Sequence, residues 1–344
     1  MAYTTIDDPT IYFNTKLYAG NGSTNAQTGV GFQPDWVWIK NRSASDHHAL
    51  YDSVRGANEF LSSSRTNIAE ITQSDGLMSF NSDGFTVGAD GGVNTNSNNF
   101  VAWNWKAGGS ASSNSNGSIT SSVSANTTAG FSIGTYNGSG SDNTVGHGLG
   151  VAPDMIFVRC RSTAHDWVVY HSALGNAKIL TLNATTAAQS ATGWQSTSPT
   201  SAVFSIDNAA NSLNQSGQSF VFYAMASKKG YSKFGSYTGN GNADGTFVYT
   251  GFKPAWVLYK KSSGTENWFL HDNKRQGFNP DNELLFADLS NAEGTVNRID
   301  LLSNGFKATT SDGGINGSGA SYIYMCFAEA PFVTAGTKAA GTAR

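Results

Sequence analysis

The acidic side chains are the first residues of this sequence that could do chemistry. A retaining glycosidase needs two carboxylates about 5 Å apart, commonly delivered as acidic residues that alternate along one strand. No such pair is present, and the glutamates do not recur at equivalent spacings: Glu59, Glu70, Glu266, Glu283, Glu293 and Glu329. No serine stands in a nucleophile-elbow motif. We therefore expect no catalytic residues and no enzymatic activity.

Histidines and loop oxygens are the candidate metal ligands. The six histidines show no metal-binding spacing that recurs along the chain. Two loops, "GADGGVNTNSNN" near Asp90 and "TSDGGINGSG" near Asp312, are rich in the oxygen ligands that calcium prefers. Each loop carries a single aspartate, so a solvated turn is favoured over a calcium site. The sequence thus predicts neither a bound metal nor another cofactor.

Two tryptophans are candidates for sugar binding. Trp167 and Trp268 stand at equivalent positions in "HDWVVYH" and "NWFLHD", beside acidic or amide residues. A solvent-facing indole stacks on the apolar C–H face of a sugar ring, so both are candidate glycan contacts. The alternative is that a tryptophan at a fixed register is a core residue, as we expect more strongly for Trp36 and Trp256.

Three loops of different charge supply the other candidate contact residues. The segments "NRSASDHH", "RSTAHD" and "KSSGTEN" each follow a strand that begins at a proline. Loops carried on a rigid scaffold are where recognition normally occurs. We therefore expect subunit or receptor contacts near Asp46, His165 and Glu266.

A threefold internal repeat positions these candidates. "GFQPDWVWIK", "GLGVAPDMIFVR" and "GFKPAWVLYK" each contain a proline, at Pro34, Pro153 and Pro254. A Tyr-x-Gly-x-Gly turn lies 16, 17 and 17 residues before the proline, and a strand led by phenylalanine lies 51, 51 and 52 residues after it. A final aromatic strand follows another 15, 16 and 16 residues on. This constant spacing indicates three copies of one unit.

Each copy is predicted to consist of strands. Runs of β-branched and aromatic residues alternate with turn pairs such as Asn21-Gly22, Asp83-Gly84 and Asn304-Gly305. A sheet with one apolar face must bury that face, and no helical pattern is available to cover it. We therefore expect two sheets packed face to face in each copy. The predicted fold class is all-β, with three tandem jelly-roll (concanavalin A-like) β-sandwich domains.

The repeat also predicts the domain boundaries and the ends of the central strands. The expected segments are repeat 1 (1–108), a Ser/Asn/Gly-rich linker (109–129), repeat 2 (130–227), repeat 3 (228–332) and a C-terminal tail (333–344). The polar, glycine-rich linker can stay flexible, whereas the short join "ASKKGYS" should hold repeats 2 and 3 in a fixed relation. Each proline is expected at a strand entrance, with Lys40, Arg159 and Lys260 where that strand emerges into solvent.

Composition excludes several classes of partner. The 344 residues carry a net charge of −3 with a pI of about 6.0, and no basic run is longer than two residues, so nucleic acid is not expected as a partner. The start of the chain lacks a signal-peptide pattern, and no apolar run is long enough to span a membrane. We expect a soluble cytoplasmic product. Cys160 and Cys326 lie in apolar strand-like runs and are expected to be buried free thiols.

The triplet of motifs resembles a known family. "Y-x-G-x-G", "GF-x-P-x-W-V" and the late "F-V-x-W" strand, with "YFNTKLYAGNG" and "VGHGLGVAPDMI", cover almost the whole chain. They resemble a domain of unknown function found, often in tandem, in virion proteins of tailed phages, especially marine ones. That family looks like the concanavalin A-like jelly rolls. The resemblance implies a structural or attachment protein on a phage particle, and it supplies no catalytic residues.

The resulting expectation is a non-enzymatic virion protein that acts as a head decoration, fibre or tail attachment component. It would be assembled in the host cytoplasm and would contact capsid or tail proteins, with self-association and host surface glycans as further contacts. Two alternatives stay open. A lectin-like carbohydrate-binding module would show exposed Trp and Asp converging in a groove, and a glycan-degrading tailspike would need a carboxylate pair.

Overall fold

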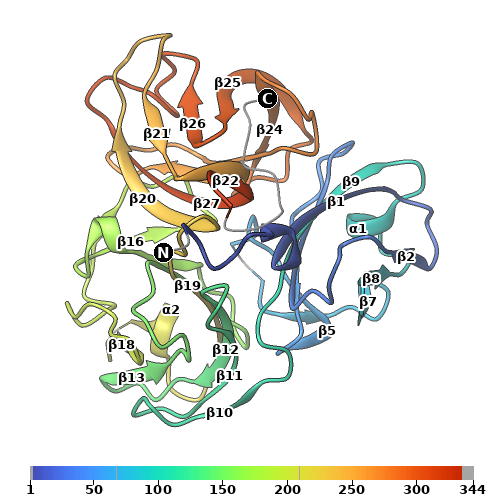
Figure 1. Cartoon of the computed structure of the whole chain (residues 1–344). Helices are drawn as coiled ribbons and strands as arrows, with labels where there is room; N and C mark the ends of the chain where they lie inside the picture. Colours follow the sequence, from blue (N-terminus) through green and yellow to red (C-terminus); the bar gives the residue numbers. More distant parts are fainter. Residues whose placement is uncertain (1–2, 67, 209, 335–344) are drawn as a thin grey trace.

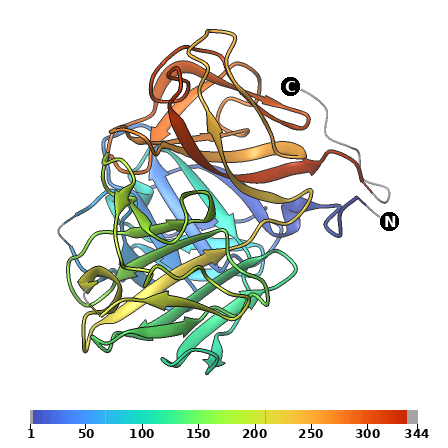
Figure 2. The same cartoon turned by 90° about the vertical axis from the view of Figure 1, so that its left-hand side faces the viewer.

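Antiparallel strands of the computed structural model gather into three lobes, which lie side by side in both views of the chain (Figure 1, Figure 2). The structure describes residues 3–66, 68–208 and 210–334. Lobe 1 spans residues 13–105, lobe 2 spans 112–225 and lobe 3 spans 232–331. None of the helices in this part of the chain is long and apolar enough to cross a membrane.

Lobe 1 consists of two sheets around an apolar core. The elements are β1 (Phe13–Ala19), β2 (Asn25–Gln27), β3 (Trp36–Asn41), β4 (Ala49–Asp52), β5 (Gly56–Leu61), β6 (Ile71–Thr72), β7 (Leu77–Asn81), β8 (Gly84–Val87), α1 (Gly91–Asn94) and β9 (Asn99–Trp105), preceded by η1 (Pro9–Ile11). One sheet has the order β1-β9-β3-β4-β5-β6 and the other β2-β8-β7. Val37 and Ile39 of the first sheet meet Leu77 and Phe85 of the second in the core.

Lobe 2 repeats this arrangement with a longer first sheet. Its elements are β10 (Ser112–Asn114), β11 (Ser121–Asn126), β12 (Phe131–Asn137), β13 (Asn143–Gly146), β14 (Met155–Cys160), β15 (Val168–His171), η2 (Ser172–Leu174), β16 (Lys178–Thr181), β17 (Gln189–Ser190), β18 (Val203–Ile206), α2 (Asn211–Asn214) and β19 (Ser219–Met225). The long sheet has the order β10-β11-β12-β19-β14-β15-β16-β17, and β13 pairs with β18. The apolar side chains of both sheets form a second core.

Lobe 3 is a single sheet that curls into a nearly closed barrel. Its strands are β20 (Ser232–Thr238), β21 (Phe247–Tyr249), β22 (Phe252–Lys261), β23 (Trp268–Asp272), β24 (Asp281–Phe286), β25 (Gly294–Leu302), β26 (Gly305–Ala308) and β27 (Ser321–Pro331). The order is β20-β27-β22-β23-β24-β25-β26-β21. The nine-residue β25 pairs with both β24 and β26, whereas β6 and β17 are two residues long and pair on one side only. This longer strand joins the two halves of the sheet.

The all-β prediction is therefore confirmed at the level of fold class. The lobes differ in strand number and in how their sheets join, and the finer assignment to tandem jelly rolls stays a prediction. The segment 109–129, predicted to be a linker, contributes β10 and β11 to the long sheet of lobe 2. Because β11 pairs with both β10 and β12, and because its residues Ser121 and Val123 are buried, this serine-rich segment is a fixed part of lobe 2.

The Tyr-x-Gly-x-Gly turns are built in the same way in each lobe. The turn tyrosine stacks on the first aromatic residue of the final strand, in the pairs Tyr18–Phe100, Tyr136–Phe220 and Tyr237–Tyr322, with ring centroids 5.1, 5.1 and 4.9 Å apart. Each tyrosine hydroxyl donates a hydrogen bond to a backbone carbonyl, that of Val93, Leu213 or Ile315. A backbone N–H of each turn donates to the side-chain oxygen of a buried asparagine, which is Asn94, Asn214 or Asn316. These contacts account for the constant spacing of the motifs.

A core shared by all three lobes lies between them. Strands buried on both faces supply it: Trp36 and Trp38 of β3 point into the shared core, and the alternate residues point into lobe 1. Trp36 stacks on Tyr223 of lobe 2 with centroids 4.5 Å apart, and Trp105 meets Trp256 of lobe 3 edge to face at 5.5 Å. Lobes that share an aromatic core form one packed body.

Candidate functional site: the seams between lobes and two equivalent hollows

Three matching hydrogen bonds join the lobes in a ring. The backbone N–H of Glu70 donates to Arg161 O at 2.8 Å (lobe 1 to 2), that of Ala188 to Ser262 O at 2.9 Å (lobe 2 to 3), and that of Glu293 to Arg42 O at 2.9 Å (lobe 3 to 1). Each contact runs in the same direction, so the third closes the ring. The acceptors lie at the start of the loops predicted to make external contacts. The first part of each loop is therefore docked against a neighbouring lobe.

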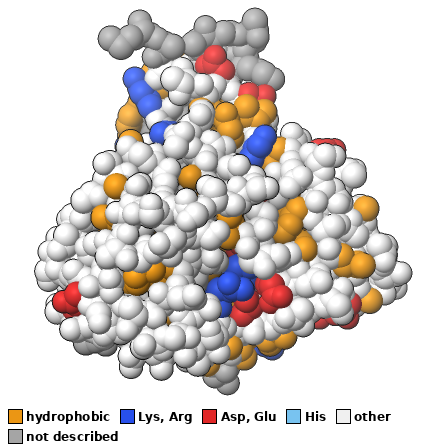
Figure 3. Space-filling view, turned by 90° about the horizontal axis from the view of Figure 1, so that it is seen from below, with side chains coloured by type: hydrophobic (Ala, Val, Ile, Leu, Met, Phe, Trp, Pro, Cys, Tyr) orange, Lys and Arg blue, Asp and Glu red, His pale blue; other side chains and the backbone are white. Residues whose placement is uncertain are grey.

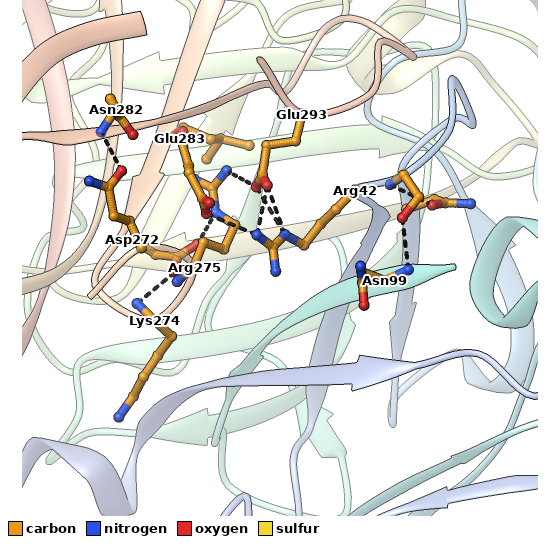
Figure 4. Close-up of polar contacts among 12 residues, drawn as sticks. Arg42, Asn99, Asp272, Lys274, Arg275, Asn282, Glu283 and Glu293 are labelled. Carbon is orange, nitrogen blue, oxygen red and sulfur yellow. Dashed lines mark hydrogen bonds and ion pairs between the residues drawn. The ribbon is translucent and has the colours of Figure 1, made fainter. Parts of the chain in front are cut away.

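Ion pairs strengthen two of the three seams. Arg42 binds Glu293 at 2.7 Å and Glu283 at 2.9 Å between lobes 1 and 3 (Figure 4). Arg161 binds Glu70 at 2.6 Å between lobes 2 and 1. The third seam has Ser262 and Ala188 at the corresponding positions, so the described side chains there cannot form this pair.

A buried ion pair supports the seam between lobes 1 and 3. The Asp272 carboxylate accepts from Arg275 Nε at 2.6 Å and from Trp103 Nε1 of lobe 1 at 3.0 Å. Arg275 also reaches Glu293, and both members of the Asp272–Arg275 pair are fully buried (Figure 4). Burial alone would raise the pKa of Asp272, but the Arg275 guanidinium and the Trp103 N–H hold it below its usual value.

Lobe 1 repeats this network, and lobe 2 departs from it. Asp52 accepts from Arg55 and, at 2.6 Å, from the hydroxyl of Tyr223 in lobe 2. The corresponding residues of lobe 2 are His171, whose Nε2 lies 3.3 Å from the Tyr324 carbonyl of lobe 3, and a half-buried leucine. Burial lowers the pKa of His171 to about 4, so this histidine is neutral at physiological pH. The same seam position is thus ionic in two lobes and neutral in one.

The two tryptophans proposed as sugar contacts are seam residues. Trp167 and Trp268 are fully buried, and their indole N–H groups donate to Ser62 O and Thr181 O of the preceding lobe at 2.8 and 2.9 Å. His48 takes this place in lobe 1, with Nε2 at 2.7 Å from a lobe 3 carbonyl. Neither indole has a face open to a sugar, because both side chains are fully buried. Trp167 and Trp268 are therefore no longer candidates for sugar binding.

The cations that end the central strands are also covered. Lys40, Arg159 and Lys260 are fully buried, so the prediction that they reach solvent is wrong. Lys40 Nζ donates to two carbonyls of its own loop, and Lys260 Nζ donates to Thr185 O across a seam at 3.1 Å. Burial lowers the pKa of both lysines to about 8 and that of Arg159 to about 10. Sequence alone could not show that a second lobe covers these strand ends.

The remaining predicted contact residues occupy one position in three different lobes. Asp46, His165 and Glu266 are half-buried, each twelve residues after its proline. Asp46 accepts from Asn41 at 2.7 Å, and His165 Nε2 lies 2.7 Å from Gln215 Oε1. The Glu266 N–H donates to the Thr185 carbonyl of lobe 2 at 2.9 Å. The fold keeps these residues in separate lobes, and of the three Asp46 alone lines a hollow, which lies in lobe 1.

The hollow of lobe 1 is a polar depression of about 210 Å³. Side chains from four separate segments line it, among them Asp46, His47, Phe60, Arg65, Gln73 and Asp90. Burial and the nearby Arg65 guanidinium lower the pKa of His47, so its imidazole is neutral at physiological pH. Burial raises the pKa of Asp90, although the Gly92 N–H bonds its carboxylate at 3.0 Å. Sequence analysis missed this grouping because its members are distant along the chain.

The hollow of lobe 2 occupies the equivalent place and is about 410 Å³ in volume. Asp166 and Val168 line it at the positions of His47 and Ala49 in lobe 1, thirteen and fifteen residues after the proline. The N-terminal residues of α2 border it, as those of α1 border the first hollow. Its lining is a mixture of aliphatic, hydroxyl and amide groups with one carboxylate.

Side chains of lobe 3 fill the corresponding place. Phe269 stands at the position of Val168, and the Arg298 guanidinium lies over its ring, 4.8 Å from the centroid. Arg298 also pairs with Asp312 at 2.5 Å. Asp312 corresponds to Asp90, because each carboxylate accepts the N–H of the glycine two residues on. The third hollow is thus closed by an arginine.

One buried polar chain resembles a catalytic arrangement. In lobe 3 the Tyr259 hydroxyl lies 3.4 Å from His271 Nε2, and His271 Nδ1 lies 3.7 Å from Asp281 Oδ1. All three residues are buried, so a substrate has no access to them in this structure. Within the described ranges, no group of three or more His, Cys, Asp and Glu side chains is placed to hold a metal ion. Cys160 and Cys326 are buried free thiols, as predicted.

Comparison with known proteins places the chain in a family. A family model described as "Domain of unknown function (DUF7483)" matches residues 8–331. No curated protein and no solved structure matches the chain. The resemblance noted in the sequence predicted a domain repeated in tandem, whereas this single match spans all three lobes, in keeping with their shared core. The chain therefore belongs to the DUF7483 family of unknown function.

Proposed function

We propose that this protein is a non-enzymatic structural and display component of a virus particle, placed on the head as a decoration or on the tail as a fibre or attachment part. The observation that carries the proposal is the closed ring of seams, in which three similar lobes form one body. Such a body would present a related surface on each of its three lobes. Contacts that are individually weak then add by avidity when several engage neighbouring subunits.

Three further observations support this proposal. The sequence motifs resemble those of tailed-phage virion proteins, and that resemblance covers nearly the whole chain. Most of the face shown in Figure 3 is uncharged, with basic and acidic side chains gathered in small clusters. The aromatic side chains that could have formed an open groove are used instead to join the lobes. Lobes joined through a shared aromatic core form a rigid body, and a rigid body suits a component that must keep its shape on a particle.

The test is to locate the protein in purified particles of the phage that encodes it. Mass spectrometry should detect it at a stoichiometric ratio to the major capsid or tail proteins, and electron microscopy should show it on the head or the tail. A non-structural protein of the same phage serves as the control for contamination. Absence from washed particles would overturn the virion assignment. Release of reducing ends from host polysaccharide by the purified protein would overturn the non-enzymatic part.

The lectin-like alternative is favoured by one observation, which is the pair of equivalent hollows in lobes 1 and 2. A particle component can also bind sugars, so the two functions do not compete. The hollows have their own chemistry and require a separate test.

A further inference from the structure

Lobes 1 and 2 each have an open hollow at an equivalent position of the fold, and in lobe 3 the corresponding place is closed. They lie at one place in the fold, between the loop after the proline strand and the short helix α1 or α2. We propose that the hollows of lobes 1 and 2 are two copies of a saccharide-binding site, each taking one unit of an uncharged glycan. This inference does not depend on the particle assignment above.

The lining of the lobe 1 hollow suits a polyhydroxylated ligand. The carboxylates of Asp46 and Asp90 can accept hydrogen bonds from sugar hydroxyls, and the Arg65 guanidinium can donate to them. Phe60 and Ala49 supply apolar surface for the C–H groups of the ring. The two carboxylates oppose an anionic ligand, and the described residues offer no metal-binding group there. An uncharged polyol fits this lining, because its hydroxyls can donate to the carboxylates and accept from the guanidinium.

The lobe 2 hollow offers the same combination with less charge. Val168 and Ile179 provide an apolar floor, and Gln189, Thr192 and Asn211 provide groups that both donate and accept. The carboxylate of Asp166 is exposed and also accepts from Asn183 at 2.7 Å. No cation is among the side chains that line this hollow in the described part of the chain. It is therefore matched to neutral sugar units.

The closed hollow of lobe 3 is filled by a side chain whose contacts can be compared with those of a sugar. Arg298 places a flat, hydrogen-bonding group over the Phe269 ring and binds the Asp312 carboxylate at 2.5 Å. A sugar ring would make the same two kinds of contact, one apolar and one to a carboxylate. The arginine thus fills the space that is open in lobes 1 and 2. Removing it should expose an aromatic platform beside Asp312.

The experiment uses the full chain with D-glucose, D-galactose, D-mannose and N-acetyl-D-glucosamine as probes. Saturation-transfer NMR identifies which sugar binds, and calorimetry with that sugar's oligomer measures affinity and stoichiometry. We expect millimolar binding of at least one monosaccharide and two sites per chain. Binding of none of the four sugars would overturn the inference.

Substitutions in each hollow show whether the sugar binds there. Arg65→Ala in the first hollow and Ser212→Tyr in the second should each remove one site, weakening binding there by about tenfold or more. Ser236→Tyr, on the exposed face of β20, is the matched control and should change nothing. Arg298→Ala should add a third site. Unchanged binding in the double variant Arg65→Ala and Ser212→Tyr, with an unchanged melting temperature, would show that the sugar binds elsewhere and would refute the assignment.

Discussion

Replacing Asp272 tests whether the buried ion pairs hold the ring of lobes together. The carboxylate accepts four hydrogen bonds: from Arg275 Nε at 2.6 Å, from Trp103 Nε1 at 3.0 Å, and from the backbone N–H groups of Lys274 and Arg275 at 2.9 and 3.0 Å. Asp272→Ala leaves the Arg275 charge with Glu293 as its remaining carboxylate and leaves the Trp103 N–H without an acceptor. Both groups stay buried.

The expected loss of stability is about 3–5 kcal/mol, the range for removing one partner of a buried ion pair. Each donor left without the Asp272 carboxylate would cost about 1–3 kcal/mol, and the four donors together would exceed the loss of about 3–5 kcal/mol expected above. Relaxation of the surrounding structure and the remaining Arg275–Glu293 contact offset part of that cost. Urea unfolding followed by tryptophan fluorescence gives the free energy of unfolding. The matched control is Asp244→Ala, because that carboxylate forms an exposed pair with Lys307 and its loss should have no measurable effect.

Lobe 2 supplies a second, sharper comparison. It has His171 in place of the aspartate and Leu174 in place of the arginine, so the fold tolerates a neutral pair at this position. The double variant Asp272→His with Arg275→Leu should therefore lose less stability than Asp272→Ala alone, because it removes the buried Arg275 charge together with its partner. A loss of less than about 1 kcal/mol in Asp272→Ala would refute the reasoning. So would a double variant that is less stable than the single one.

The loss of folding stability in acid is an independent test of the same Asp272–Arg275 ion pair. The folded-state pKa of Asp272 lies below its unfolded value, so its contribution is complete at neutral pH and is lost as pH falls through the folded pKa. Asp272→Ala should consequently lose less stability than the native chain between neutral pH and strong acid. Equal acid sensitivity of the two proteins would contradict the assigned cause.

The other predictions concern the shared core and the buried lysines. Trp256→Ala should cost about 3–5 kcal/mol in urea unfolding, because its ring lies in the core common to the lobes; a loss under about 1 kcal/mol would mean the site is not packed as described. Residues 232–331 expressed alone should aggregate or remain partly unfolded by circular dichroism, since the core-facing side of the lobe would be exposed; a soluble, cooperatively folded fragment would count against the single body. Stability should rise from about pH 8 to about pH 9.5, because burial lowers the folded pKa of Lys40 and Lys260 to about 8 while unfolded lysine titrates near 10.4, so the unfolded chain binds more protons there. Lys40→Met with Lys260→Met should flatten this rise, and an unchanged slope would exclude the lysines as its cause.

Local patterns allowed much of each lobe to be predicted. The spacing from the turn tyrosine to the proline strand corresponds to a real set of contacts, in which Tyr18 stacks on Phe100 and bonds the Val93 carbonyl. The run "DWVWIK", rich in β-branched and aromatic residues, indicated a strand and a core position for Trp36, and both are observed. These features are encoded within short windows, where propensity and periodicity act.

The relation between lobes could not be predicted from such windows. A strand that is apolar on both faces must be covered twice, and "DWVWIK" carried that signal, but it did not reveal what covers the second face. For this reason Lys40 was expected to reach solvent and Trp167 stayed a candidate ligand contact, although both side chains are fully buried. The hollow of lobe 1 was missed because Asp46, Gln73 and Asp90 converge only through the topology.

The closed ring of seams also bears on how such a molecule can diverge. In a homotrimer one substitution appears at every interface at once, so a change must be tolerated three times over. Here the three interfaces are encoded separately. The third seam lacks the arginine–glutamate pair of the others, and Arg298 closes one hollow while two stay open. Duplication within one chain thus permits one copy to gain or lose a feature while the other two keep the assembly intact.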